Sequence, residues 1–529
     1  MKSIGKFLIL SSLLVSLVLP GCQNGKSSGK STSVSDKTGW SYNNPKKGFF
    51  NVNTDYYGKC PNGMVYIPVA TTVRGQNNDM LSIVKNNAKK RVASSAFYMD
   101  EYEVTNLEWR EYVQWLQGVY KFKPEVIVKA LPDESVWRKE LAYNEPYVLE
   151  YYVSPAYNDY PVVGVSWKQA TEYCKWRTDR LNELVLIESG VIPYIPLEMV
   201  SLRIKENPDS VNKYIFTAKN ARDYVYFVNA NYDEFETEDG ETLDYEPAYK
   251  KFDMNKDGEI LQEEWKYALE GALYDNECRL PTEVEWEYAA YGLDSEEGIY
   301  EQTNMYPWQG TQMRSFEEKK EKERGKFYAN FLRGRGDPIG VQLNGTLTMP
   351  VYSFEPNSFG LYNMAGNVNE WVKDVYRANV TIVEDINAYR GNEFETDSLY
   401  AEEILNKHFA YLEPALRDSM RVVLIAERGI TKTGGDYRNF KDGDMQSSLE
   451  SDSAVIESVY KDLTPIEQAN MISNTARVYK GGGWNDRAIW LNPSQRRWLD
   501  ERDCRNDIGF RCVMSTVGGF EQQREYEKY

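Results

Sequence analysis

The chain opens with a sharp change from positive to apolar residues. Lys2 and Lys6 precede a mostly apolar run from Phe7 to Leu19, and small residues follow it. A positive segment, a short apolar core and a small residue before a cleavage point are typical of a secretory signal. The run is too short to cross a bilayer as a helix, which argues against a transmembrane anchor. We therefore predict that residues 1–21 form a signal peptide.

Small polar residues dominate the next segment. Residues 23–39 read QNGKSSGKSTSVSDKTG, a composition typical of a flexible linker. We predict a tether over residues 22–39, an ordered domain over 40–515 and a polar C-terminal tail over 516–529.

Periodic apolar positions within the domain predict three helices and two short strands. In the first helix, Trp109, Tyr112, Val113 and Leu116 share one face, and the second and third begin at capping residues. The third opens with a Thr-x-x-Glu capping box. The predicted helices are Leu107–Gly118, Ser166–Arg180 and Thr282–Tyr291, and the predicted strands are Pro350–Phe354 and Arg477–Gly481.

Two long acidic segments interrupt this pattern, residues 181–277 and 376–475. We interpret both as insertions into a single domain. Insertions that carry charge are candidate docking surfaces for partners.

Composition excludes several classes of function. The formal net charge of −18 argues against nucleic acid as a partner. A zinc site built on histidines and a Ser-His-Asp triad are excluded because His408 is the one histidine. Beyond residue 22, the five cysteines at positions 60, 174, 278, 504 and 512 contain no Cys-x-x-Cys motif. An odd number leaves one unpaired if the others form disulfides.

The segment Leu19-Pro20-Gly21-Cys22 resembles the end of a bacterial lipoprotein signal. That resemblance implies cleavage before Cys22 and acylation of its thiol, with more than one acyl chain giving stable anchoring. The alternative is an ordinary secretory signal followed by an incidental cysteine.

Nine motifs occur in an order that resembles the formylglycine-generating-enzyme (sulfatase-modifying factor) family. They are GMVYIPVA (63–70), AFYMDEYEVTN (96–106), YPVVGVSWKQATEYCKW (160–176), RLPTEVEWEYAAYG (279–292), YPWQG (306–310), YANF (328–331), NSFGLYNMAGNVNEW (357–371), RVYKGGGW (477–484) and IGFRCV (508–513). The resemblance implies an α+β fold of the C-type-lectin-like kind, with little regular secondary structure.

Two further segments narrow the resemblance to gliding-motility lipoproteins of the GldJ type, relatives of the GldK type. They are TGWSYNNPKKGFF (38–50) and GGGWNDRAIWLNPSQRRWLDE (481–501). The resemblance implies an outer-membrane lipoprotein facing the periplasm, in a structural or assembly role within the gliding and type IX secretion machinery. Its implied partners are other envelope proteins of that machinery, such as GldK-like lipoproteins.

The enzymes of the family oxidise a substrate cysteine with copper held by two thiolates, which follow a motif like GGGW. The matching stretch here, residues 484–497, contains no cysteine, and Cys504 lies beyond it. Because copper(I) prefers thiolate ligands, we expect no bound copper and a pseudoenzyme. The resemblance also implies that Cys174 and Cys512 form a disulfide. Seven motif residues are then expected to cap helices, fill the core and fix loops: Glu103, Asn106, Trp167, Glu283, Glu285, Trp286 and Arg511.

Residues 253–264, DMNKDGEILQEE, have the spacing of an EF-hand calcium loop. In such a loop Asp253, Asn255 and Asp257 provide side-chain oxygens, Glu259 its carbonyl and Glu264 two carboxylate oxygens. The alternative is an acidic turn between two helices.

A second calcium site is implied by the resemblance alone. The matching ligands are Asn363, Gly366, Val368 and Glu370, the middle two through their carbonyls. Asn330 and Phe331 match the start of a third site, but residues 336–346 depart from its pattern. Two other functions stay open: an active copper-dependent oxidase and a calcium-dependent carbohydrate-binding module.

Overall fold

The chain forms two compact units, residues 1–56 and 57–529. The computed structural model describes residues 34–35, 37–42, 60–75, 87, 89–138, 143–206, 211–231, 235–237, 240, 242–243, 273–274, 276–292, 305–308, 310–315, 325–333, 347–376, 405, 419, 422 and 475–516. In the first unit, Val34 and Ser41 form a β-bridge around a tight turn.

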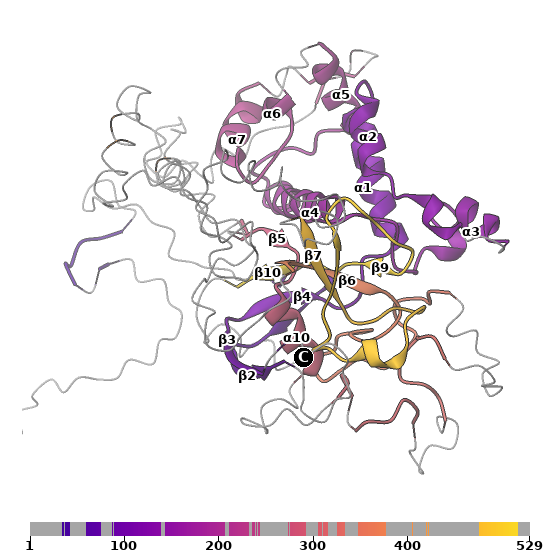
Figure 1. Cartoon of the computed structure of the whole chain (residues 1–529). Helices are drawn as coiled ribbons and strands as arrows, with labels where there is room; N and C mark the ends of the chain where they lie inside the picture. Colours follow the sequence, from indigo (N-terminus) through magenta and orange to yellow (C-terminus); the bar gives the residue numbers. More distant parts are fainter. Residues whose placement is uncertain are drawn as a thin grey trace, which may run out of the picture. The chain divides into compact units, whose positions relative to one another are not determined.

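One four-stranded sheet joins the two ends of the second unit. Its strand order is β1-β4-β10-β5, and each pair is antiparallel. Met99 lies opposite both Val65 and Val513, so β4 pairs with β1 on one side and with β10 on the other. Figure 1 shows β4, β10 and β5 close together. The strands are β1 (Met64–Ile67), β4 (Phe97–Asp100), β5 (Cys278–Arg279) and β10 (Val513–Ser515).

A second four-stranded sheet carries the motif residues of the C-terminal half. Its order is β8-β7-β6-β9, with β6 and β9 parallel. Glu370 lies opposite Lys480 on one side and Gly509 on the other. A separate hairpin pairs β2 with β3. The strands are β6 (Asn369–Val375), β7 (Ala476–Lys480), β8 (Arg497–Asp500), β9 (Ile508–Gly509), β2 (Ala70–Arg74) and β3 (Lys90–Ser94).

The three predicted helices are confirmed, each with its cap. Helix α1 (Asn106–Val119) begins after Thr105, whose side chain forms a capping box with Glu108. Helix α4 (Trp167–Glu188) begins after Ser166 and continues eight residues past the predicted end. Helix α10 (Glu283–Tyr291) begins after the predicted Thr282 cap and ends at Gly292, which has a positive φ.

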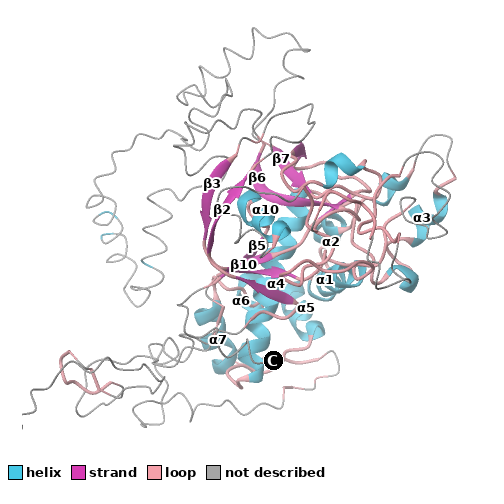
Figure 2. Cartoon of the chain, turned by 90° about the horizontal axis from the view of Figure 1, so that it is seen from below, coloured by secondary structure: helices cyan, strands magenta, loops and turns pink. Residues whose placement is uncertain are grey.

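Further helices surround these three, and Figure 2 shows them beside the strands. Helices α5 to α7, from within residues 181–277, pack around their own core, which includes Phe216, Val225 and Phe235. The remaining bounds are α2 (Pro124–Ala130), α3 (Glu145–Glu150), α5 (Leu197–Glu206), α6 (Val211–Tyr214), α7 (Ala221–Ala230) and the 3-10 helices η1 (Glu134–Trp137), η2 (Pro155–Tyr157) and η6 (Ala488–Leu491).

One predicted strand is confirmed and the other is wrong. Residues 477–481 correspond to β7, displaced by one residue. Residues 350–354 form a turn instead. The backbone N–H and the hydroxyl of Ser353 both donate to the Pro350 carbonyl, at 3.0 and 2.6 Å, which closes the turn. Among the described helices, none has the length and apolar character needed to span a membrane.

Candidate functional site

A fully buried carboxylate lies where the second sheet meets α10. Glu370 projects from β6 and accepts two hydrogen bonds from Arg511, Nε to Oε2 at 2.7 Å and Nη2 to Oε1 at 2.6 Å. The indole N–H of Trp286 donates to the same Oε2 at 2.7 Å. All three side chains are completely buried. This bidentate pair is the strong form of a charge-assisted hydrogen bond, and it ties three sequence motifs together.

A second buried carboxylate lies beside this pair. Glu103 accepts from Asn363 Nδ2 at 2.9 Å and from Asn367 Nδ2 at 3.1 Å. Both asparagines have positive φ, 53° and 64°, which asparagine tolerates better than most residues. Burial raises the pKa of Glu103 to about 8; Arg511 opposes that rise and the charge of Glu370 adds to it. The guanidinium of Arg511 thus acts on two carboxylates. It forms hydrogen bonds with Glu370, whereas it affects Glu103 only through its charge.

The buried carboxylates Glu103 and Glu370 lie among the predicted calcium ligands Asn363, Gly366, Val368 and Glu370. The Asn363 Oδ1 atom is buried and has no hydrogen-bond partner among the described residues, as a ligand oxygen of an absent cation would be. Gly366 has φ 88°, and a Cβ there would lie 2.6 Å from the Asn330 carbonyl, so the loop is held close. Glu370, by contrast, already neutralises Arg511. Asn363 therefore offers a ligand oxygen, whereas both oxygens of Glu370 already accept hydrogen bonds, and the calcium site stays a prediction.

The other predicted calcium ligands give less information. Asn330 is buried, its carbonyl accepts from the Asn367 N–H at 2.9 Å, and Phe331 packs in a hydrophobic cluster beside it. Residues 253–264, with the EF-hand-like ligands, and Cys22 lie outside the described residues. Within the described ranges, no group of three or more His, Cys, Asp or Glu side chains is arranged to hold a metal ion.

An ion pair occupies the stretch that matches the copper ligands of the family. Asp486 accepts from both terminal nitrogens of Arg497 at 2.6 Å, from Asn369 Nδ2 at 2.9 Å and from the Gly483 N–H at 2.8 Å. Burial alone would raise the pKa of Asp486, but the hydrogen bonds and charge of Arg497 lower it below its ordinary value. Asp486 is therefore held as a carboxylate whose oxygens are already hydrogen-bonded.

Aromatic rings fix the orientation of this arginine. The guanidinium carbon of Arg497 lies 4.8 Å from the ring centroid of Tyr479 and 4.6 Å from that of Trp490. These cation–π contacts leave the guanidinium little freedom to move away from Asp486. Arg497 and Asp486 are thus held together within residues 484–497.

A second buried ion cluster surrounds the start of α10. Lys480 donates to Glu283 at 3.1 Å and to Glu287 at 3.2 Å, and Arg496 Nε donates to Glu283 at 2.5 Å. Burial would raise the pKa of Glu283, yet Arg496 and Lys480 hold it well below its usual range. These charges are paired, as fully buried charges must be.

The described thiols lie in surroundings that disfavour thiolates. Cys504 lies 3.8 Å from Asp133 Oδ2, and burial together with that carboxylate raises its pKa to about 11. Burial raises the pKa of Cys60 to about 11 and that of Cys278 to about 12. Because the thiolate is the nucleophile and the metal ligand, none of these three is poised for either role.

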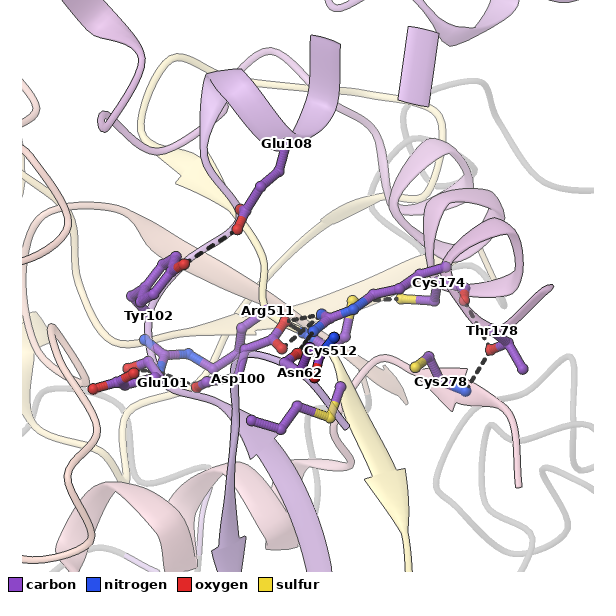
Figure 3. A network of polar contacts seen from close by, with 12 residues as sticks. Asn62, Asp100, Glu101, Tyr102, Glu108, Cys174, Thr178, Cys278, Arg511 and Cys512 are labelled. Atoms are coloured by element: carbon purple, nitrogen blue, oxygen red, sulfur yellow. Dashed lines mark hydrogen bonds and ion pairs between the residues drawn. The ribbon is translucent and has the colours of Figure 1, made fainter. Parts of the chain in front are cut away.

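Cys174 and Cys512 are neighbours in the core (Figure 3). Their sulfur atoms lie 3.2 Å apart, and both thiols are free in this structure. A disulfide bond is about 2.05 Å long, so the predicted bond is not formed here, although the two residues are adjacent. Their disulfide stays a prediction.

The seven motif residues expected to be structural make structural contacts. Asn106 donates to the carbonyls of Tyr151 and Tyr157, and Trp167 donates to that of Val372. Glu285 caps its own helix and binds Arg279. The contacts of the other four are those of the two buried clusters above. The Asp486–Arg497 pair was not predicted; only the absence of cysteine from its stretch pointed to a change there.

A family model, the sulfatase-modifying factor enzyme 1-like domain, matches residues 53–516. The chain belongs to this FGE-sulfatase family. Its mixture of helices and sheets agrees with the α+β prediction; the C-type-lectin-like description stays a prediction.

Named relatives include both active and inactive proteins. The formylglycine-generating enzyme of Bos taurus is 24% identical over 331 residues, 62% of each chain, so this chain spans about 62% of that relative. The formylglycine-generating enzyme of Thermomonospora curvata is 36% identical over 122 residues, 23% of this chain and 34% of the relative. The inactive Cα-formylglycine-generating enzyme 2 of Bos taurus is 38% identical over 101 residues, 19% of this chain and 28% of the relative.

Two solved structures also match most of the chain, with TM-scores below 0.5. PvdO from Pseudomonas aeruginosa has a TM-score of 0.35 at 14% identity, covering 86% of this chain and 94% of that one. Treponema denticola variable protein 1 has a TM-score of 0.33 at 18% identity, covering 86% and 95%.

Proposed function

We propose that this protein is a non-catalytic lipoprotein that acts as a structural component of the gliding-motility and type IX secretion machinery. The observation that carries the non-catalytic part is the Asp486–Arg497 pair within residues 484–497. Copper(I) needs soft thiolate ligands, and this stretch offers a carboxylate already bound to a guanidinium. An inactive relative in the family shows that loss of activity occurs within it.

Turnover of a peptide tests this directly. Purified protein loaded with copper would be incubated in air with a Cys-x-Pro-x-Arg peptide, and formylglycine would be measured by mass spectrometry. We expect no product under conditions in which an active formylglycine-generating enzyme converts the peptide. Product formation would show that the protein is an oxidase.

Lipid attached to Cys22 would hold the domain on the outer membrane, on its periplasmic side. The signal pattern before Cys22 and the polar tether after it support this proposal. Mass spectrometry of the mature protein should find an acylated N-terminal cysteine. An unmodified residue upstream of Cys22 would contradict it.

The proposed partners are other envelope proteins of the same machinery, such as GldK-like lipoproteins. The resemblance of residues 38–50 and 481–501 to gliding-motility lipoproteins supports this assignment. Crosslinking in cells and affinity capture from outer membranes should recover such proteins. A matched sample with Cys22→Ala, which removes the acylation site, should recover fewer of them. Capture of no such protein, or equal capture of these proteins from both samples, would contradict it.

Calcium would stiffen the domain at the EF-hand-like loop and at the Asn363 centre. Calorimetric titration with calcium alone should show binding that Glu264→Gln abolishes in the loop. Glu259→Gln is the matched control, because residue 259 would contribute only its backbone carbonyl. Absence of heat and of thermal stabilisation by calcium would end this part of the proposal.

A further inference from the structure

A short stretch around α2 combines exposed apolar and basic side chains. Phe122, Val128 and Leu131 are 42, 66 and 40% exposed, although they lie within ten residues of one another. Scattered surface hydrophobics are ordinary, but such a cluster marks a surface that contacts something. The other side of the same stretch is packed: Ala130 is buried, and Val126 lies against the main core. The stretch is therefore anchored to the core by one side, while Phe122, Val128 and Leu131 are exposed.

Four lysines lie in or beside this stretch. Lys121, Lys123 and Lys129 come from the stretch itself, and Lys205 reaches it from α5. The Lys205 ammonium lies 4.9 Å from the ring centroid of Phe122, and that of Lys121 lies 6.0 Å from it. We call these seven residues, Lys121, Phe122, Lys123, Val128, Lys129, Leu131 and Lys205, the basic apolar patch.

The charge of this patch is opposite to that of the chain. The whole protein carries a formal charge of −18, whereas residues 121–131 contain three lysines and one acid, Glu125. A local positive surface attracts anions and repels the same positive surface of a second copy. A symmetric dimer that buries the patch of each copy against the other is therefore disfavoured.

The size of the patch favours a lipid surface over a folded protein. A stable protein interface buries about 800 Å² on each partner, usually with aromatic anchors in pockets. Three apolar side chains on one helical stretch fall short of that. A membrane surface needs less: a few apolar side chains enter the headgroup region while lysine ammonium groups remain at the phosphates.

We propose that the basic apolar patch binds the surface of a bilayer that contains anionic phospholipid. Phe122, Val128 and Leu131 enter the interface, and the four lysines pair with lipid phosphates. The inference rests on the proposed membrane location only for its biological setting. The contact would hold one face of the domain against the membrane, which a flexible tether alone would not do.

Vesicle binding tests the proposal independently of the acyl chain. The protein would start at Gln23, which removes Cys22 and the signal but keeps every residue that the structure describes. We expect sedimentation with vesicles of phosphatidylcholine and phosphatidylglycerol, little with phosphatidylcholine alone, and weaker binding as salt rises. Each lysine near an anionic surface changes partitioning about fivefold, so the triple variant Lys121→Gln, Lys123→Gln, Lys129→Gln should bind roughly 100-fold more weakly.

A matched variant separates the patch from overall charge. Lys175→Gln, Lys219→Gln and Lys326→Gln remove the same charge from other segments and should bind like the unaltered chain. Phe122→Ser with Val128→Ser should weaken binding at every salt concentration. Equal loss in both triple variants, or equal binding to both kinds of vesicle, overturns the proposal. Binding to neither vesicle also overturns it and leaves a protein occupant for the patch. Because the tested protein lacks Cys22, none of these results depends on whether Cys22 is acylated.

Discussion

Two arginine–carboxylate pairs lie in the second sheet and its neighbouring loops, and they differ in burial. Glu370 and Arg511 have no exposed side-chain surface, whereas Asp486 and Arg497 retain 10 and 16%. Arg511 also donates to the carbonyls of Asp100 and Tyr362, so it joins the two sheets. Arg497 lies near the rings of Tyr479 and Trp490, and both Arg497 and Asp486 bind Asn369 of β6. The first pair joins the two sheets, and the second links residues 484–497 to the second sheet.

The two pairs also differ in the motifs that contribute their residues. The Glu370–Arg511 pair uses residues of two family motifs, GNVNEW and GFRC. The Asp486–Arg497 pair lies in residues 484–497, the stretch that we matched to the copper ligands of the family. If the Asp486–Arg497 pair is not needed to hold the two sheets together, its loss should lower the free energy of unfolding far less than loss of the Glu370–Arg511 pair.

The largest effect is expected from Arg511→Met. Removing the guanidinium leaves Glu370 charged and buried without its partner, which costs about 3–5 kcal/mol of the free energy of unfolding. Denaturant unfolding followed by fluorescence measures it. The double variant Glu370→Gln, Arg511→Met should recover part of this loss, because no unpaired charge remains. A double variant no more stable than Arg511→Met would show that packing, and not charge, holds this centre.

Glu103 makes the same centre sensitive to pH. Its pKa in the folded protein is raised to about 8, above the ordinary value near 4.3. A raised carboxyl pKa means that stability is full below the unfolded pKa and is lost as pH rises toward 8. The slope is up to about 1.4 kcal/mol per pH unit. Glu103→Gln should flatten the fall in stability between pH 5 and 8, measured with a calcium chelator present. Parallel curves for the two proteins would contradict this.

Arg497→Met should have an intermediate effect. Asp486 keeps the Gly483 N–H and the Asn369 amide as donors and is partly reached by water, so we expect a loss of about 1–3 kcal/mol. The pKa of Asp486 is lowered in the folded state, so its contribution is present above about pH 4 and is lost as pH falls further. The variant should therefore lose less stability than the parent in acid. A loss as large as that of Arg511→Met would place this pair in the scaffold.

The helices of the scaffold could be predicted because their signals are local. Thr105, Ser166 and Thr282 begin helices through side-chain caps that act within four residues. The continuation of α4 to Glu188 could not be predicted, because packing against α5 to α7 determines it. The Pro350 turn was missed since its apolar letters resemble a strand, while its hydrogen bonds come from one serine.

In the candidate site, too, some residues could be predicted from local motifs, while their long-range contacts could not. Glu370 and Asn363 were found through motifs, yet the arginine bound to Glu370 lies 141 residues away in sequence. The pKa of Glu103 depends on burial, on the charges of Arg511 and Glu370 and on the hydrogen bond from Asn363, all more than 250 residues away in the sequence, which one sequence does not reveal. The sequence shows that an aspartate stands at position 486, but it does not show that Arg497 binds it. Contact between charges separated in the sequence depends on the folded backbone.

The smallest change in stability is expected for an exposed ion pair, which serves as the reference for the two arginine–carboxylate pairs. Lys175 and Glu172 form a pair on α4 whose side chains are 53 and 61% exposed. Pairs of this kind contribute about 0.3–0.5 kcal/mol because water screens them and ordering two long side chains costs entropy. Lys175→Ala should therefore change the free energy of unfolding by less than about 0.5 kcal/mol, and added salt should remove the difference. If Lys175→Ala lowered the free energy of unfolding as much as Arg497→Met, burial would not explain how the three ion pairs rank in stability. The distinction between the buried Glu370–Arg511 pair and the partly exposed Asp486–Arg497 pair would then fail.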